Sequence, residues 1–251
     1  MIAGLLVGSF TNVLIARVPA GKGVITGRSA CPRCNHTLAW YDNLPLLSWL
    51  VLRARCRYCS TRISAQYPLV EGAVALLWLA VYLVHGIGFT ALLLAYLAPV
   101  SVALTVIDVR HHRLPHRIVL PSYAVTVAIM ACAWTSGESA SWWTALIGLV
   151  ALGGFYGLLW FIYPKGMGFG DVTTAGLLGL ALGFLGLENL AVGAIAGPLV
   201  GGLMVIALAT VRKAGRGTRI PYGPALLTGA WIGLLAGSEL AAGYLRILGV
   251  Q

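Results

Sequence analysis

Eight long apolar stretches follow one another along this chain of 251 residues. They comprise residues 2–18, 67–84, 89–107, 118–135, 142–163, 172–187, 190–211 and 224–245. Only 10% of the residues are charged, against about 25% in ordinary soluble domains. Crossing a bilayer takes about 20 apolar residues, and in lipid the backbone must satisfy its own hydrogen bonds. The sequence therefore predicts an all-α fold, a polytopic membrane helix bundle with about eight transmembrane helices.

The basic residues are confined to alternate loops between these stretches. All Lys and Arg residues except Arg17 and Arg246, 15 of the 17, lie in loops on one expected side. The connections 85–88, 136–141 and 188–189 contain neither Lys nor Arg. By the positive-inside rule the basic loops are expected in the cytosol and both termini outside. Topology thus explains the formal charge of +10, and we expect a lipid bilayer but no nucleic acid as a partner.

The first apolar stretch is expected to be a retained span and not a cleaved signal peptide. No Lys or Arg precedes it, whereas a signal peptide carries its positive charge before the apolar region. The order of segments predicts a first transmembrane helix over 1–18, a cytosolic four-Cys zinc-binding segment over 19–66, and a seven-helix membrane domain over 67–251.

Four of the five cysteines form two CxxC pairs in the polar segment: Cys31, Cys34, Cys56 and Cys59. Two such pairs can supply four thiolates to a tetrahedral zinc ion. A site closed by four protein ligands leaves no open position for a substrate, so the predicted zinc is structural. The alternative is a set of free or redox-active cysteines. A cytosolic location disfavours disulfides between them but does not disfavour thiolates that bind a metal.

The whole chain contains only three Asp residues, and Asp42 lies in the polar cysteine segment. Asp108 ends the third apolar stretch and Asp171 begins the sixth, so both are expected at the cytosolic boundary of the membrane. Ionisable groups there are costly and often functional. The plainer interpretations are a salt bridge from Asp108 to Arg110 or Arg113, and a helix N-cap for Asp171.

The two carboxyl groups are the candidate catalytic pair. Adjacent carboxylates tend to share one proton, which leaves one as general base and the other as general acid around a water. Helix dipoles predict that Asp171, at a helix start, is ionised and that Asp108, at a helix end, is protonated. Asp171 follows a loop with Gly166, Gly168 and Gly170, which we expect to admit a substrate backbone closely.

With these motifs assembled, the chain resembles the type IV prepilin peptidases, which are bifunctional leader peptidases and N-methyltransferases of the membrane GxGD aspartyl protease group. The resemblance rests on an ordered series: GSFTNV at 8–13 with RVP at 17–19, CPRC with His36, NLP and SWL, CRYC, IS at 63–64, YPLVE at 67–71, Asp108 with Leu114-Pro115, GFGD at 168–171, and PYGP at 221–224.

This resemblance implies a function. Asp108 and Asp171 would be the catalytic dyad, and the substrates would be precursors of type IV pilins or pseudopilins, cut at the cytosolic face of the bacterial inner membrane. The new N-terminus would then be methylated from S-adenosylmethionine. No residue pattern identifies the methyl-donor site. Two positions depart from the family, which usually has Asp where this chain has His116 and often has Lys where it has Thr173.

Two other functions fit part of the sequence. A transporter would also carry intramembrane acids, but usually near the bilayer midplane and not at helix ends. A zinc-anchored scaffold of a pilus or secretion system, without catalysis, would have no need of paired aspartates. Replacing either acid separates these interpretations, because a scaffold should tolerate the change and a protease should lose its activity.

Overall fold

We describe the chain from a computed structural model over residues 1–24, 29–138, 141–211 and 221–249. The predicted cytosolic residues Arg28, Arg212, Lys213, Arg216 and Arg219 lie outside these ranges. Within the ranges the elements are α1 (Ile2–Arg17), the 3-10 helix η1 (Trp40–Asn43), α2 (Leu47–Val51), α3 (Gln66–His85), α4 (Phe89–His111), α5 (His116–Thr135), α6 (Trp142–Ile162), α7 (Phe169–Leu185), α8 (Leu187–Val211) and α9 (Gly223–Ile247).

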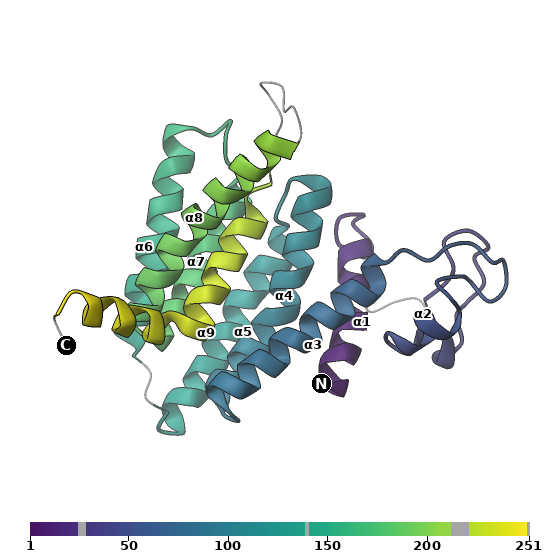
Figure 1. The fold of residues 1–251 in the computed structure, drawn as a ribbon, viewed down its shortest axis with the longest axis horizontal. Coiled ribbons are helices and arrows are strands. Elements are labelled where there is room, and N and C mark those ends of the chain that lie inside the picture. The colour runs from purple at the N-terminus through teal and green to yellow at the C-terminus, as the bar shows by residue number, and fades with distance from the viewer. Residues whose placement is uncertain (25–28, 139–140, 212–220, 250–251) are drawn as a thin grey trace.

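The all-α membrane bundle is confirmed, with a long helix at each of the eight predicted apolar stretches (Figure 1). In the described part of the chain, six helices are long and apolar enough to cross a membrane: α3, α4, α5, α6, α8 and α9. The other two, α1 and α7, are apolar but shorter, with 16 and 17 residues. The five-residue helix α2 lies inside the cysteine segment and was not predicted from the sequence.

The helix α7 is short because protein and not lipid surrounds it. Every residue from Thr174 to Phe184 is buried, a run of 11 positions without an exposed face. Close contact with α6 depends on glycine: a Cβ atom at Gly179 would collide with the carbonyl oxygen of Gly148. Small residues allow such close backbone approach in membrane bundles. The bundle therefore encloses α7 from Thr174 to Phe184, and the first turn of the helix reaches its surface.

The helices α4 and α7 are joined through two neighbours. Both α5 and α9 pack against α4 and also against α7. This arrangement brings the C-terminal end of α4, with Asp108, and the N-terminal end of α7, with Asp171, to the same end of the bundle. The fold thus accounts for how two acids separated by 63 positions in the chain can form one site.

The cysteine segment stands to one side of the bundle, next to α1 and α3 (Figure 1). A buried contact ties it to the membrane helices: the backbone N–H of Leu46 donates to Oε2 of Glu71 in α3, at 2.8 Å. At the same level α1 approaches α3 closely, because a Cβ atom at Gly8 would lie 2.6 Å from Cα of Glu71. Glu71 therefore links the cysteine segment to the α1–α3 pair.

At the opposite end of α4, the carboxylate of Glu138 binds the start of the helix. It accepts hydrogen bonds from the backbone N–H of Phe89 at 2.6 Å and of Thr90 at 2.9 Å. The Thr90 hydroxyl, together with these N–H groups, lowers the pKa of Glu138 below its ordinary value of 4.5. The interaction therefore stabilises the folded state above pH 4.5, and this stabilisation is lost as the pH falls through the lower folded-state pKa.

We expect Glu138→Gln to reduce the free energy of unfolding by about 1 kcal/mol at neutral pH, as for other lost helix caps. Thermal unfolding in detergent should show this as a lower midpoint, with a gap from the parent protein that narrows in acid. Glu239→Gln is the matched control, since Glu239 is an exposed acid in α9 and lies away from any helix start. A gap that stays constant down to strongly acidic pH would contradict the role of the carboxylate charge.

Candidate active site and metal centre

Asp108 lies one turn before the end of α4 and is 95% buried, with a relative exposure of 5%. Its Oδ2 accepts a hydrogen bond from the backbone N–H of Gly223 at 2.8 Å. Gly223 is the first residue of α9, so the partial positive charge of that helix start faces the carboxylate. Neither Arg110 nor Arg113 forms an ion pair with Asp108 among the residues that the structure describes, so the salt-bridge interpretation is wrong.

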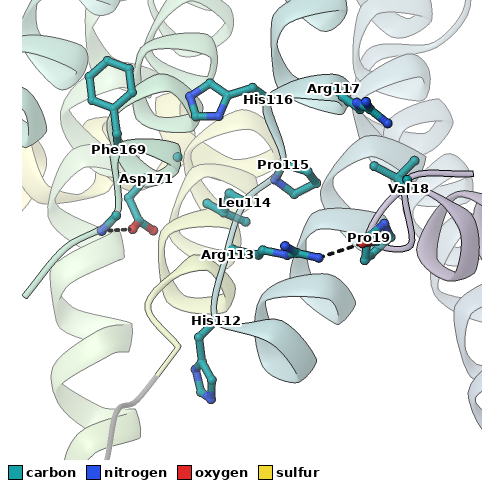
Figure 2. Close-up of a pocket in the computed structure, with 13 residues that line it drawn as sticks. Val18, Pro19, His112, Arg113, Leu114, Pro115, His116, Arg117, Phe169 and Asp171 are labelled. Atoms are coloured by element: carbon teal, nitrogen blue, oxygen red, sulfur yellow. Dashed lines mark hydrogen bonds between the residues drawn. The ribbon is translucent and has the colours of Figure 1, made fainter.

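Asp171 lies in the first turn of α7 and is half-buried. Its Oδ2 accepts a hydrogen bond from the backbone N–H of Gly168 at 3.1 Å (Figure 2). Gly168 is the N-cap residue, so Asp171 closes the first turn from inside the helix and is not itself the N-cap. The side chain keeps a free carboxylate oxygen that faces the neighbouring cavity.

The two carboxyl groups are close enough to repel each other electrostatically. Asp171 lies in the first turn of α7, and Asp108, near the end of α4, faces the start of α9. From the sequence, helix dipoles were expected to favour an ionised Asp171 and a protonated Asp108. For Asp108 that expectation rested on the end of α4 alone and did not include the N–H of Gly223 at the start of α9. Because both carboxylates meet a helix N-terminus, the helix dipoles do not distinguish the two acids, and a shared proton remains a prediction.

A cavity of about 500 Å³ opens beside Asp171 (Figure 2). Its walls come from the end of α1, the segment between α4 and α5, and the start of α7. Arg113 fixes two of these walls, because its Nη2 donates to the carbonyl oxygen of Pro19 at 2.8 Å. At the rim, the ring of His116 stacks on Phe169 with the ring centres 5.7 Å apart. The cavity combines an acid, several basic side chains and aromatic surface.

The positions that depart from the family pattern have definite places in this site. His116 takes part in the rim stack described above, and Thr173 points back into its own helix, where Oγ1 donates to the carbonyl oxygen of Gly170 at 3.1 Å. Neither residue contacts Asp108 or Asp171 through a hydrogen bond in the described structure.

The glycines before Asp171 make close contacts within the protein that could not be predicted from the sequence. Phe169 and Gly170 already belong to α7, so the expected open loop ends at Gly168. A Cβ atom at Gly170 would lie 2.6 Å from the carbonyl oxygen of Leu114, and one at Gly166 would overlap the ring of Tyr163. Gly170 thus allows the α4–α5 connection to pack on α7. Their proposed role in admitting a substrate remains a prediction.

Sequence reasoning noted the PYGP motif but not its role beside Asp108. Tyr222 shares a 2.7 Å hydrogen bond between hydroxyl groups with Tyr156 of α6, and Gly223 follows it with the N–H that binds Asp108. These contacts connect α6, the start of α9 and the carboxylate in one chain. The Pro-Tyr-Gly-Pro pattern, with proline just inside a helix start, was the available signal.

Gly223→Ala is expected to lower activity at Asp108 by about 10- to 100-fold, as a small displacement of a reacting group can. The added Cβ would lie 2.7 Å from Oδ2 of Asp108, so the carboxylate must move. Gly243→Ala in the same helix is the matched control, because a Cβ there meets nothing within 4 Å. Rates measured at equal amounts of inserted protein test this, and equal activity of both variants would show that Gly223 does not position the acid.

The four cysteines meet in one cluster, as the sequence predicted. Their Sγ atoms all lie within 4.8 Å of one another, and those of Cys31 and Cys59 are 3.7 Å apart. The cluster can hold a metal ion. Cys132 lies apart from it, in α5. His36 stacks on Tyr58 with ring centres 3.6 Å apart, which leaves it outside the cluster as well.

The two CxxC turns have the same backbone design. In the first, Cys31 N–H donates to the carbonyl of His36 and Asn35 N–H to that of Cys31. In the second, Cys56 and Ser60 make the equivalent bonds with Thr61 and Cys56. The residue after each second cysteine is left-handed, with φ of 53° at Asn35 and 55° at Ser60. Each turn therefore presents two sulfur atoms from a tight loop.

Backbone groups favour thiolate in this cluster. The N–H groups of Cys34 and Arg33 face the sulfur of Cys31 and lower its pKa to about 6. The N–H of Thr61 likewise lowers the pKa of Cys59. Against the N–H of His36, burial and the sulfur atoms of Cys31 and Cys59 raise the pKa of Cys34 to about 11. Metal binding needs deprotonated sulfur, so an ion bound by all four cysteines would displace the proton that Cys34 retains.

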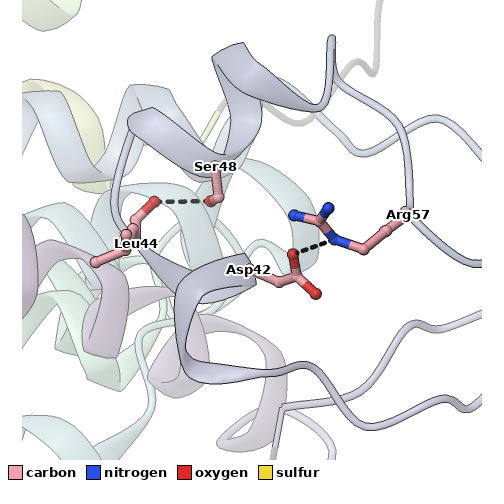
Figure 3. Close-up of polar contacts among 4 residues, drawn as sticks. All are labelled: Asp42, Leu44, Ser48 and Arg57. Carbon is pink, nitrogen blue, oxygen red and sulfur yellow. Dashed lines mark hydrogen bonds and ion pairs between the residues drawn. The ribbon is translucent and has the colours of Figure 1, made fainter.

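Asp42 also has a structural role in the cysteine segment, which could not be predicted from the sequence. It is buried, and its Oδ1 accepts a hydrogen bond from Nε of Arg57 at 2.8 Å (Figure 3). Arg57 follows Cys56 directly and also lies over the ring of Tyr41, 5.3 Å from its centre. The ion pair joins η1 to the second CxxC turn.

Comparison with known proteins covers nearly the whole chain. A family model for the bacterial peptidase A24 N-terminal domain matches residues 2–85, and one for the type IV leader peptidase family matches residues 95–211. The prepilin leader peptidase/N-methyltransferase of Stutzerimonas stutzeri is 33% identical over 270 residues, covering 98% of this chain and 92% of the relative.

Two further relatives have the same name. The protein of Aeromonas hydrophila is 36% identical, with 96% of this chain and 91% of the relative covered. The protein of Pseudomonas aeruginosa is 32% identical, with 100% and 94% covered. No solved structure matches the chain. With matches of this extent to both parts of the fold, the chain belongs to the type IV leader peptidase family.

Proposed function

We propose that this protein is a membrane aspartyl endopeptidase that removes the leader of type IV pilin or pseudopilin precursors and then N-methylates the new N-terminus. One observation carries the proposal. Of the three Asp residues in the chain, two lie at one end of the bundle within electrostatic reach of each other, and one of these, Asp171, lines a cavity. The names of the relatives supply the class of substrate, and the acids supply the chemistry.

The hydrolysis would use the two carboxyl groups with one proton between them. The ionised member takes a proton from a water, which attacks the carbonyl carbon of the scissile peptide bond. The protonated member donates its proton to the carbonyl oxygen, which gives a tetrahedral gem-diol. The other member then passes the proton that it took from the water to the leaving amine as the C–N bond breaks, and a hydroxyl proton of the gem-diol returns to the first member. The N–H of Gly223 holds the Asp108 carboxyl in place through both steps. Since the dyad serves as a unit, loss of either acid should stop the reaction.

Methyl transfer would use S-adenosylmethionine as the donor, which supplies an electrophilic methyl group when bound. The cavity beside Asp171 fits such a molecule in size, since small-molecule sites span about 300–1,000 Å³. Arg113 and Arg117 at its wall would pair with the donor's carboxylate, and Asp171 would face its positive sulfur. The amine released by cleavage arises next to this cavity, so one pocket can serve both reactions.

Zinc is the metal that best suits the cysteine cluster. Four thiolates at about 2.3 Å from a tetrahedral ion lie about 3.8 Å from each other. The 3.7 Å between Cys31 and Cys59 agrees with that spacing. Cys34 and Cys56 would complete the set. All four positions are then filled by protein, so the ion would stabilise the 19–66 segment and take no part in cleavage.

A reconstituted assay tests the proposed function. Purified protein in liposomes is mixed with a pilin precursor and S-adenosylmethionine, and mass spectrometry follows the precursor. We expect loss of the leader and a gain of one methyl group on the shortened chain only. If the precursor stays intact under conditions where a relative cleaves it, the peptidase assignment fails. Cleavage without methylation would refute the second activity alone.

The orientation we propose places the dyad at the cytosolic face of the bacterial inner membrane. Reporter fusions near residues 40, 113 and 167 are expected to report cytosol, and those near 87, 138 and 188 the outside, because the basic loops stay inside. Each fusion is compared with its neighbour one helix along, which should give the opposite signal. Reporters near 113 and 167 on different sides would separate the two acids and overturn the shared site.

A further inference from the structure

The short helix α2 turns its apolar side outward. Leu47, Leu50 and Val51 are spaced as i, i+3 and i+4, so they share one face of the helix. Their relative exposures are 60%, 62% and 76%. A helix on a soluble domain normally does the reverse and buries this stripe. In α2 the stripe has no protein partner within the described structure.

The other side of α2 is the side held by the protein. Oγ of Ser48 donates to the carbonyl of Leu44 at 2.7 Å, and Nε1 of Trp49 donates to the carbonyl of Ile63 at 3.3 Å. Figure 3 shows Ser48 directed toward Leu44 across the start of the helix. The Ser48 bond closes the turn that leads into α2, and the Trp49 bond attaches this side of the helix to the residues after the second CxxC turn. The apolar stripe therefore faces outward while the opposite side of α2 is bonded to the protein.

The neighbouring η1 adds aromatic surface to this stripe. It packs against α2, and its Trp40 is 77% exposed. Together Trp40, Leu47, Leu50 and Val51 form what we call the α2 patch. Contiguous apolar surface of this kind marks an interaction site. Tryptophan beside aliphatic side chains is the composition typical of the membrane–water interface.

The position of the α2 patch identifies its partner. The residue before α2, Leu46, is hydrogen-bonded to Glu71 near the start of α3. Leu69, in the same turn of α3, is 69% exposed on a helix that is long and apolar enough to cross a membrane. The hydrogen bond to Glu71 therefore holds the start of α2 beside the first turns of this apolar helix. Directly after α2, the exposed Arg53 and Arg55 supply positive charge for anionic headgroups.

We propose that the α2 patch inserts into the lipid leaflet at the boundary between headgroups and acyl chains, with Arg53 and Arg55 on anionic headgroups. The cysteine segment is then held on the membrane by three attachments: the end of α1, the start of α3 and the patch. This inference does not depend on the peptidase assignment, because it concerns residues away from Asp108 and Asp171.

The test is photo-crosslinking from single positions in the full-length, zinc-loaded protein. A photoreactive amino acid replaces Leu50, and the protein is placed in nanodiscs of phosphatidylcholine and phosphatidylglycerol. The same residue at Leu69 is the lipid-facing reference. At Ser60, an exposed position in the second CxxC turn, it is the control on the same segment. Zinc content and precursor cleavage are measured on each sample, which shows that the substituted protein is folded.

We expect lipid adducts at position 50 to reach at least about half the yield at 69 and to exceed those at 60 by about fivefold, as for a side chain within the acyl boundary. A yield at 50 no higher than at 60 would overturn the proposal. So would a change of adduct from lipid to precursor when precursor is present, which would make the patch a substrate surface. Adducts between two copies of the chain would instead identify a dimer interface.

The arginine part of the proposal has its own readout. In Arg53→Gln/Arg55→Gln, the share of phosphatidylglycerol among the adducts at position 50 should fall by about twofold, to its share in the bilayer, since each charge near the surface attracts anionic lipid. Total adduct yield should change little, because the apolar side chains remain. An unchanged share of phosphatidylglycerol would show that these arginines do not face the headgroups.

Discussion

Leader cleavage is expected to fall by at least about 1,000-fold in Asp108→Asn and in Asp171→Asn, because an amide can act neither as general base nor as general acid and the two groups work as a unit. Both substitutions preserve size, and Asn keeps an oxygen that accepts from Gly223 or Gly168. Insertion and thermal stability should therefore remain close to those of the parent protein. The measurement is the cleavage rate of a pilin precursor at equal amounts of reconstituted enzyme.

Asp42→Asn is the informative control for these variants. Asp42 is the third Asp residue of the chain and is also buried, but it lies in the cysteine segment with Arg57 as its partner. We expect its replacement to loosen that segment while the purified, folded fraction still cleaves. Cleavage at the parental rate by either Asp108→Asn or Asp171→Asn would remove that residue from the dyad. We expect the double variant to lose no more cleavage activity than each single variant, because the two acids act as a unit.

Zinc is expected to be lost almost completely from Cys59→Ser, from about one ion per chain in the parent protein to less than about a tenth, because three thiolates bind much more weakly than four. The segment 19–66 is short and polar and depends on the ion for its fold, so limited proteolysis should cut it rapidly. The helical bundle should survive, since the helices α4–α9 pack mainly on one another and on α1 and α3.

Cys132→Ser provides the matched control for zinc, because this cysteine is in α5 and away from the cluster. It should keep the full metal content and the parental digestion pattern. Elemental analysis of protein purified without chelator gives the first readout and proteolysis the second. Retention of zinc by Cys59→Ser, or its absence from the parent protein, would contradict a four-thiolate site.

The long helices and the cysteine cluster could both be predicted from the sequence, each for a different reason. Apolar runs long enough to span a membrane allow one kind of element, so the eight long helices could be placed to within a few residues. Two CxxC turns with short spacing define a metal cluster almost by themselves. In both cases the chemistry is local, and no information on tertiary packing is needed.

The tertiary contacts could not be predicted from the sequence. The N–H of Gly223 reaches Asp108 over 115 positions, and this contact places the start of α9 beside the carboxylate. Gly170 looked like a point of substrate access but also packs against the carbonyl of Leu114. The outward stripe of α2 went unnoticed because five residues are too few for a periodic pattern. Each depends on which helices become neighbours, and apolar composition does not specify that.

The hydrogen bond between Asp108 and Gly223 has a consequence for biosynthesis. Helices enter the membrane in the order of translation, and α9 is the last of the described helices to be made. A nascent chain that has completed α8 already contains both acids, but the group that holds Asp108 has not yet been synthesised. The enzyme should therefore stay inactive until α9 joins the bundle, so that unfinished chains would not cut neighbouring membrane proteins during their own assembly.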